Sequence, residues 1–141
     1  MSAALIAALF FTVALLVITT YFLLGSAPLL ILKHDTPKDF RFVRGFFNIY
    51  YRAATFVTCA AAASYALAGK PLFLAGTAAL ALLVVALRRH IIATMEALGT
   101  RIQSGEGSAI HAFRRTHVAA ILVNLAQLVL IVWSLVAFPP L

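Results

Sequence analysis

The sequence predicts an all-α, polytopic membrane protein, and three observations support this prediction. Of the 141 residues, 64% are hydrophobic and 11% are charged, whereas soluble domains are roughly half apolar and a quarter charged. The apolar residues are spread along the whole chain, which has a mean hydropathy of +1.04, so a soluble domain with one anchor is excluded. The sequence lacks the period-two alternation of a transmembrane β-barrel. We therefore expect a single membrane domain built from helices.

Four stretches have the roughly 20 apolar residues that a helix needs to cross a ~30 Å hydrocarbon core. Proline disrupts the preceding helical turn, so Gly25 and Pro28 mark the end of the first stretch. Pro71 suits the first turn of the third, and Ser108 suits the N-cap of the fourth. The predicted helices cover residues 3–24, 45–69, 71–102 and 108–138.

Short polar connections separate these helices, which predicts an up-down-up-down four-helix transmembrane bundle. Of the 11 Lys and Arg residues, ten flank the first and third connections and only Lys70 lies at the second. Positive charge marks the cytoplasmic side of membrane proteins, so both termini are expected on the non-cytoplasmic side. The ten residues are Lys33, Lys38, Arg41, Arg44, Arg52, Arg88, Arg89, Arg101, Arg114 and Arg115.

The formal net charge of +7 is explained by this distribution together with attraction to anionic lipid headgroups. A nucleic-acid partner is therefore not needed to account for it. We expect the lipid bilayer of a bacterial cytoplasmic membrane as the surroundings, and a larger membrane complex or a homo-oligomer as a further partner.

Three helices are predicted to carry a cationic or ligating side chain at one depth near the cytoplasmic interface. At ~1.5 Å per residue, Arg52, His90 and His117 lie roughly 25, 28 and 31 Å from the outer ends of their helices. A haem b between His90 and His117 would satisfy bis-imidazole ligation, with arginines for its propionates. A quinone or a lipid could occupy the same cleft instead of haem. In the remaining alternative these side chains bind no ligand and lie at the membrane interface.

Two polar stripes follow helical spacing and are expected to face the interior, because polar groups in hydrocarbon cost free energy unless they are satisfied. On the fourth helix His117, Asn124 and Gln127 share one face, with Arg114 one turn before. On the second helix the stripe comprises Asn48, Arg52, Thr55 and Cys59. The candidate binding residues are therefore His90, His117, Arg52, Asn124 and Arg114.

Catalytic chemistry has no clear signature in this sequence, so enzymatic activity stays open. Cys59 lies too deep to pair with a histidine base. His111 and His117 are six residues apart and so lie on different helix faces, and no metal site is predicted.

Several motifs resemble those of a broad group of small four-helix membrane proteins that includes the anthrone-oxygenase-like proteins and families of unknown function. The resemblance extends from about Tyr21 to Val136. It implies the four-helix fold and a role for His117 and Asn124, although Thr116 stands where the enzyme members have an aromatic residue. The motifs are Gly25 with Pro28, the segment Phe47-Asn48-Ile49-Tyr50-Tyr51-Arg52, the segment Phe113-Arg114-Arg115-Thr116-His117, and Asn124-Leu125-Ala126-Gln127-Leu128.

Two functions follow from these patterns. The first is a membrane protein whose cytoplasm-side His/Arg layer binds an apolar or redox ligand such as haem, quinone or lipid. The second is a non-catalytic accessory or assembly subunit of a larger membrane complex, in which the polar layer serves helix association and the run from Ala60 to Ser64 is a close-packing surface.

Overall fold

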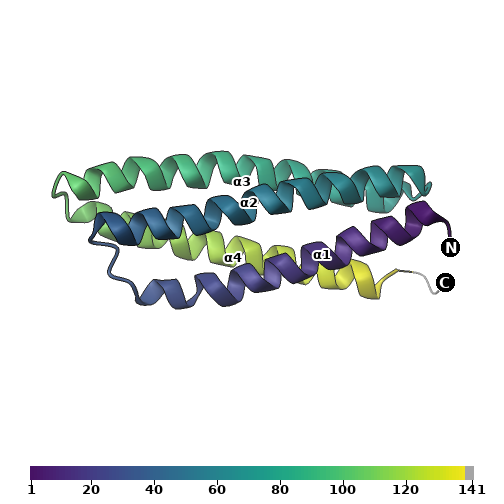
Figure 1. Ribbon diagram of the computed structural model, residues 1–141, viewed down its shortest axis with the longest axis horizontal. Coiled ribbons are helices and arrows are strands. Elements are labelled where there is room, and N and C mark those ends of the chain that lie inside the picture. The colour runs from purple at the N-terminus through teal and green to yellow at the C-terminus, as the bar shows by residue number, and fades with distance from the viewer. Residues whose placement is uncertain (139–141) are drawn as a thin grey trace.

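The computed structural model of the protein describes residues 1–138, and the regular secondary structure in this range is entirely helical. The all-α prediction is therefore confirmed. The elements in chain order are α1 (Ala3–Ser26), the short 3₁₀ helix η1 (Pro28–Ile31), α2 (Pro37–Leu67), α3 (Pro71–Gln103) and α4 (Ser108–Val136), as drawn in Figure 1.

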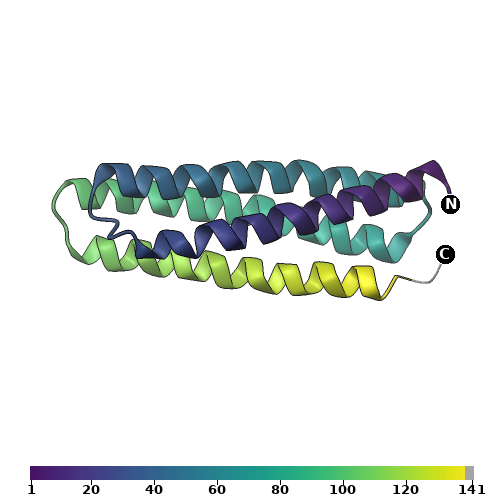
Figure 2. The ribbon, with the colours of Figure 1, turned by 60° about the horizontal axis from the view of Figure 1, so that its bottom comes forward.

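The four long helices lie side by side, and the start of α1 lies at the same end of the molecule as the end of α4 in both ribbon views (Figures 1 and 2). Each helix packs against its neighbours in the chain, and α4 also packs against α1. The connections η1 to α2 and α3 to α4 lie together at the opposite end. We call this the linker end, and the other the terminal end.

Three of the helices are long and apolar enough to cross a membrane: α1 with η1, α3 and α4. The prediction of helices long and apolar enough to cross a membrane is confirmed for these three. The second predicted span, α2, is not among the helices that are apolar enough to cross a membrane. Tyrosine, threonine and serine side chains and Arg52 occupy positions where the other helices carry leucine, isoleucine and valine.

The helix ends follow local sequence signals, but the start of α2 and the N-cap of α4 differ from those predicted from the sequence. The side chain of Ser2 accepts a hydrogen bond from Leu5 N and caps α1. Thr36 caps α2 through Asp39 N, with Pro37 in the first turn, so α2 begins eight residues before the predicted 45. The predicted cap at Ser108 is wrong, since the N-cap is Gly107, which has no side chain to accept a bond.

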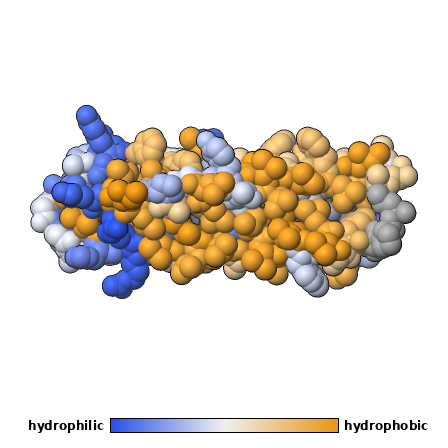
Figure 3. Space-filling model, turned by 90° about the horizontal axis from the view of Figure 1, so that it is seen from below, coloured by the Kyte–Doolittle hydropathy of each residue, from blue (hydrophilic) through white to orange (hydrophobic). Residues whose placement is uncertain are grey.

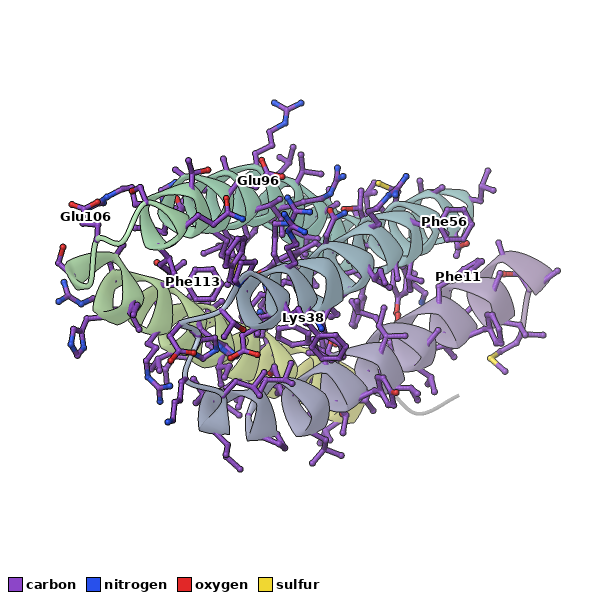
Figure 4. The ribbon with its side chains drawn as sticks, turned by 60° about the vertical axis from the view of Figure 1, so that its left-hand side comes forward. Phe11, Lys38, Phe56, Glu96, Glu106 and Phe113 are labelled. Atoms are coloured by element: carbon purple, nitrogen blue, oxygen red, sulfur yellow. The ribbon has the colours of Figure 1, made fainter. Side chains whose placement is uncertain are left out.

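Glycine is required at the two tight connections. Gly69 after α2 and Gly105 after α3 have φ angles of 65° and 86°, a region that residues with a Cβ atom rarely adopt. At the second of these turns Arg101 Nε also forms an ion pair with Glu106 Oε2 at 2.6 Å, and Figure 4 labels Glu106 in this connection. The turn therefore fixes the antiparallel return of α4 along α3.

The interior is aromatic toward the linker end and is supplied mainly by α2. Phe22 of α1 stacks on Tyr50 with ring centroids 4.1 Å apart and meets Phe47 edge-on at 4.8 Å. The surface shows the complementary pattern, because hydrophilic residues gather at one end and apolar residues cover most of the remaining face in Figure 3. Side chains such as Leu72, Leu82 and Val136 are 73–80% exposed, which is the surface expected against lipid.

Candidate functional site

His117 lies fully buried on α4, against the end of α1. Its Nε2 atom is 3.0 Å from the backbone carbonyl oxygen of Ser26. That carbonyl is free because the chain tightens after α1, where Leu30 N donates to Ala27 O instead of Ser26 O. His117 therefore satisfies a backbone group that the helix end leaves without an intrahelical partner.

Arg114, one turn before His117, performs a similar task for η1. Its guanidinium donates to Leu32 O at 2.7 Å and to Leu30 O at 2.8 Å. Cationic groups are favourable beside the last carbonyls of a helix, where the backbone dipoles leave partial negative charge. Arg114 consequently ties α4 to the connection between α1 and α2.

His34 completes the site, and the sequence analysis did not select it. It lies in the linker between η1 and α2, outside any helix, yet its side chain is fully buried. Its ring centroid lies 5.5 Å from that of His117 and 5.3 Å from that of Phe113, and Figure 4 shows Phe113 between the helices. We refer to His34, Arg114 and His117 as the histidine cluster.

The backbone of His34 also marks it as an unusual residue. Its φ angle is 59°, in the left-handed region that costs a residue with a Cβ atom about 1–2 kcal/mol. Arg114 Nη1 lies 3.3 Å from His34 Nδ1, so the strained conformation is held by this contact and by burial.

The neighbours of the two rings determine which nitrogen carries the proton. Arginine has only donors, so His34 Nδ1 accepts and its Nε2 carries hydrogen. The Ser26 carbonyl only accepts, so His117 Nε2 carries hydrogen, and in the neutral ring Nδ1 is an acceptor. Neither His34 Nε2 nor His117 Nδ1 has a hydrogen-bond partner within residues 1–138. The histidine cluster thus holds one unpartnered donor and one unpartnered acceptor.

The charge state of His34 agrees with this assignment. Burial, followed by the positive charge of Arg114, lowers the pKa of His34 below its ordinary value of 6.5, while Asp39 and Asp35 act in the opposite direction. His34 is therefore neutral at pH 7.

Asn124 forms a second buried polar group, two helical turns from His117. Its Oδ1 accepts from Tyr50 OH at 2.9 Å, and its Nδ2 donates to Tyr51 OH at 3.3 Å and to Ala120 O at 2.8 Å. Tyr50 OH also lies 3.4 Å from Thr19 Oγ1, so α1, α2 and α4 meet at this point. The prediction that the α4 stripe faces the interior is confirmed, and Gln127 is buried as well.

His90 and Arg52 do not join this interior. Both side chains are exposed on the outside of α3 and α2, so the prediction of one inward-facing layer with His117 is wrong for them. Bis-imidazole haem ligation needs both rings to face one cleft, whereas His117 faces the interior with Nε2 already bonded to Ser26. A haem between His90 and His117 does not fit this arrangement.

The predicted α2 stripe likewise lies toward the surface. Cys59 is exposed, and Asn48 Oδ1 accepts from Arg88 Nε of α3 at 3.1 Å. The interior face of α2 is formed instead by Phe47, Tyr51, Ala54, Thr58, Ala61 and Tyr65. The run from Ala60 to Ser64 contributes Ala61 and Ser64 to internal packing.

One sequence signal could have pointed to His34. The segment between Pro28 and Pro37 is too short to leave the helices, so it must cross directly over the end of α1 toward α2. A histidine in such a crossing meets whatever α4 presents there, and α4 presents Arg114 and His117. The buried tyrosines had a weaker signal in the sequence. Tyr50 and Tyr51 are adjacent, so helical spacing does not place them on one face, yet both side chains are buried.

Comparisons with protein-family models, with curated proteins and with solved structures give no match. Because these comparisons give no match, the class of this protein is described from its fold and its candidate site alone. The chain is a helical protein with three helices able to cross a membrane and with a buried histidine cluster at its linker end.

Proposed function

We propose that the chain is an integral membrane protein that binds an apolar molecule bearing a hydroxyl group, of the quinol or phenol class, at the histidine cluster. One observation carries the proposal: His34 and His117 are both fully buried, are in ring contact, and each retain an unpartnered nitrogen. Buried polar atoms in folded proteins are nearly always hydrogen-bonded, so we expect a bound ligand to hydrogen-bond to these two nitrogen atoms.

A hydroxyl group matches the two free nitrogens in type. It donates its proton to His117 Nδ1 and accepts a hydrogen bond from His34 Nε2, and both needs are met by one atom. A quinone carbonyl oxygen only accepts, so it engages His34 alone. A metal cation is disfavoured at the same place, because the Arg114 guanidinium contacts the His34 ring.

Access to the histidine cluster depends on the linker that carries His34. Residues 32–36 lie between η1 and α2 outside any helix, so their displacement exposes His117 without breaking a long helix. That movement also releases the strained φ angle of His34. The aromatic rings of Phe47 and Phe113 beside the two histidines provide the apolar contact that a quinol or phenol ring requires.

Binding is tested with purified protein and a short-chain quinol, with the corresponding quinone in parallel. We expect saturable binding that weakens about ten-fold in His34→Gln and in His117→Gln, since each loses one hydrogen bond and leaves a polar ligand group unpaired. The exposed His90 and His111 provide matched controls, and His90→Gln and His111→Gln should bind as the parent does. Equal affinity in all four variants, or no saturable binding, would refute the proposal.

The proposal includes a topology in the bacterial cytoplasmic membrane, with all four helices crossing and both termini on the non-cytoplasmic side. α2 packs against α1 and α3, which are apolar and of similar length, and its tyrosine and threonine hydroxyls are bonded inside, as Thr58 and Tyr50 show. Its lower hydropathy is thus compatible with crossing. Seven of the 11 Lys and Arg residues lie near the linker end, Arg52, Arg88 and Arg89 lie near the middle of α2 and α3, and only Lys70 lies at the terminal end.

Topology is tested by single-cysteine labelling in a Cys59→Ala background. A cysteine at Ser104 should react only from the cytoplasm, and one at Lys70 only from the outside. Labelling of both positions from one side would show that α3 does not cross.

An accessory-subunit role is the second candidate, and the exposure of α3 favours it. Only 6% of the most apolar window of α3 is buried, against 22% for α1 and α4, and small residues including Gly76 and Ala79 lie on its exposed face. Small residues allow another helix to approach closely. Co-purification of a partner that is lost in Ala79→Leu but kept in His117→Gln would favour this role.

A further inference from the structure

A second polar feature lies on the outer surface, away from the histidine cluster. A groove of about 480 Å³ runs between α2 and α3. Its polar lining comes mainly from arginines, and its apolar lining comes from side chains nearer the terminal end of α2 and α3. The residues are Arg52, Arg88, Arg89, Thr55, Phe56, Cys59 and Val85.

The three arginines have no acidic partner. Within residues 1–138 the two ion pairs join Arg44 to Glu96 and Arg101 to Glu106. The remaining acidic residues are Asp35, in the linker before α2, and Asp39, in the first turn of α2. Among the described residues, the three arginine side chains make one hydrogen bond, which Arg88 Nε donates to Asn48 Oδ1 at 3.1 Å. Three guanidinium groups therefore gather in one groove without a counter-charge.

Their depth makes this arrangement unusual. Arg52 lies eight residues beyond Arg44, roughly 12 Å further from the linker end, and Arg89 lies 12 residues, roughly 18 Å, from Arg101. Both Arg52 and Arg89 are exposed on the face that also exposes Phe56, which Figure 4 labels on α2. Charged groups at the edge of hydrocarbon are costly unless an opposite charge meets them.

We infer that this groove binds the phosphate of an anionic phospholipid, with one acyl chain lying over Phe56, Cys59 and Val85. The charge and the shape agree, because the arginines stand at the linker end of the groove and the apolar residues follow toward the membrane centre. From Arg52 to Cys59 the groove extends seven residues, about 10 Å along α2, which is long enough to align part of an acyl chain. Guanidinium groups bind phosphate oxygens through paired, charge-assisted hydrogen bonds.

The experiment measures binding of phosphatidylglycerol to the full chain in detergent, by native mass spectrometry and by the shift in Tm. Phosphatidylcholine is the zwitterionic control lipid. The test variant is Arg52→Gln with Arg89→Gln, which leaves the Arg88–Asn48 hydrogen bond in place. The matched control is Lys38→Gln with Arg115→Gln, two exposed cations at the linker end, which removes the same amount of charge.

We expect one tightly bound phosphatidylglycerol with a rise in Tm, at least ten-fold weaker binding in the Arg52/Arg89 variant, and unchanged binding in the control variant. Equal loss in both variants would show a general charge effect and overturn the inference, as would equal binding of phosphatidylcholine. Inorganic phosphate separates the two sources of a phosphate group. If phosphate alone gives the full rise in Tm and phosphatidylglycerol adds nothing, the groove is a free-phosphate site and the lipid assignment is overturned.

Discussion

The polar stripes of α4 and α2 have the same helical spacing but opposite positions in the molecule. His117, Asn124 and Gln127 of α4 are buried, whereas Arg52 and Cys59 of α2 are exposed. Inside the protein His117 bonds to a backbone carbonyl, and Asn124 bonds to a backbone carbonyl and to tyrosine hydroxyls, whereas Gln127 Nε2 has no hydrogen-bond partner within residues 1–138. The α2 stripe borders the arginine groove instead. Spacing therefore shows that polar residues share a face, and their chemistry decides which face it is.

The α4 stripe is buried and the α2 stripe is exposed because their polar groups need different hydrogen-bond and charge partners. An amide or neutral imidazole is satisfied by two or three fixed partners, which the interior supplies to Asn124. A guanidinium carries a charge that an interior without carboxylates cannot neutralise, and its long stem reaches water or a lipid phosphate from the surface. The predictions below test this contrast, from the largest expected effect to the smallest.

Replacement of Asn124 by leucine is expected to have the largest effect. The change keeps the volume but leaves the hydroxyls of Tyr50 and Tyr51 without their partner, so the free energy of unfolding should fall by about 2–3 kcal/mol. Denaturation in mixed micelles measures it. Thr55→Val on the α2 stripe is the control and should change stability by less than about 0.5 kcal/mol. A smaller loss for Asn124→Leu than for Thr55→Val would contradict the contrast.

Sequence alone predicted the helices well, because length, hydropathy, prolines and glycines act locally. It also predicted the burial of Asn124, since an uncharged polar residue in an apolar helix needs an internal partner. It misjudged Arg52 and His90, because the direction of a side chain around its helix depends on packing. His34 was missed because its burial arises from a linker that crosses the end of α1, a tertiary feature without periodicity.

Acidification should destabilise the protein through the histidine cluster. His34 faces Arg114 and His117 of α4 and the carboxylates of Asp35 and Asp39, and its folded-state pKa is lowered from 6.5 by burial and by Arg114. The unfolded chain therefore binds a proton near pH 6.5 while the folded chain does not, so stability is expected to fall as the pH decreases below about 6.5.

The slope for one such group is at most about 1.4 kcal/mol per pH unit, measured from unfolding curves between pH 7.5 and 5. His34→Gln should make the curve flatter, and His111→Gln, an exposed histidine of α4, should leave it as it is. A steeper dependence in His34→Gln would show that His34 is charged in the folded protein.

Replacement of Tyr50 by phenylalanine tests the link between the α4 stripe and the interior face of α2. The variant loses the 2.9 Å bond to Asn124 and the contact with Thr19, while the ring stacked on Phe22 is kept. We expect a loss of about 1 kcal/mol. In a double-mutant cycle with Asn124→Leu, the two losses should add to more than the loss in the double variant, because they share one hydrogen bond. Full additivity would place the two side chains out of contact.

Replacement of Arg52 by glutamine is expected to have the smallest effect. In detergent without phospholipid, Arg52 has neither an acidic partner nor an interior position, so the free energy of unfolding should stay within about 0.5 kcal/mol of the parent value. Denaturation in the same micelles as for Asn124→Leu allows a direct comparison of the two stripes. A loss near that of Asn124→Leu would mean that Arg52 faces the interior after all, and the α2 stripe would then resemble the α4 stripe. A negligible loss that grows once phosphatidylglycerol is added would instead show that the outward stripe is stabilised by lipid, because only the parent has the full set of arginines to bind it.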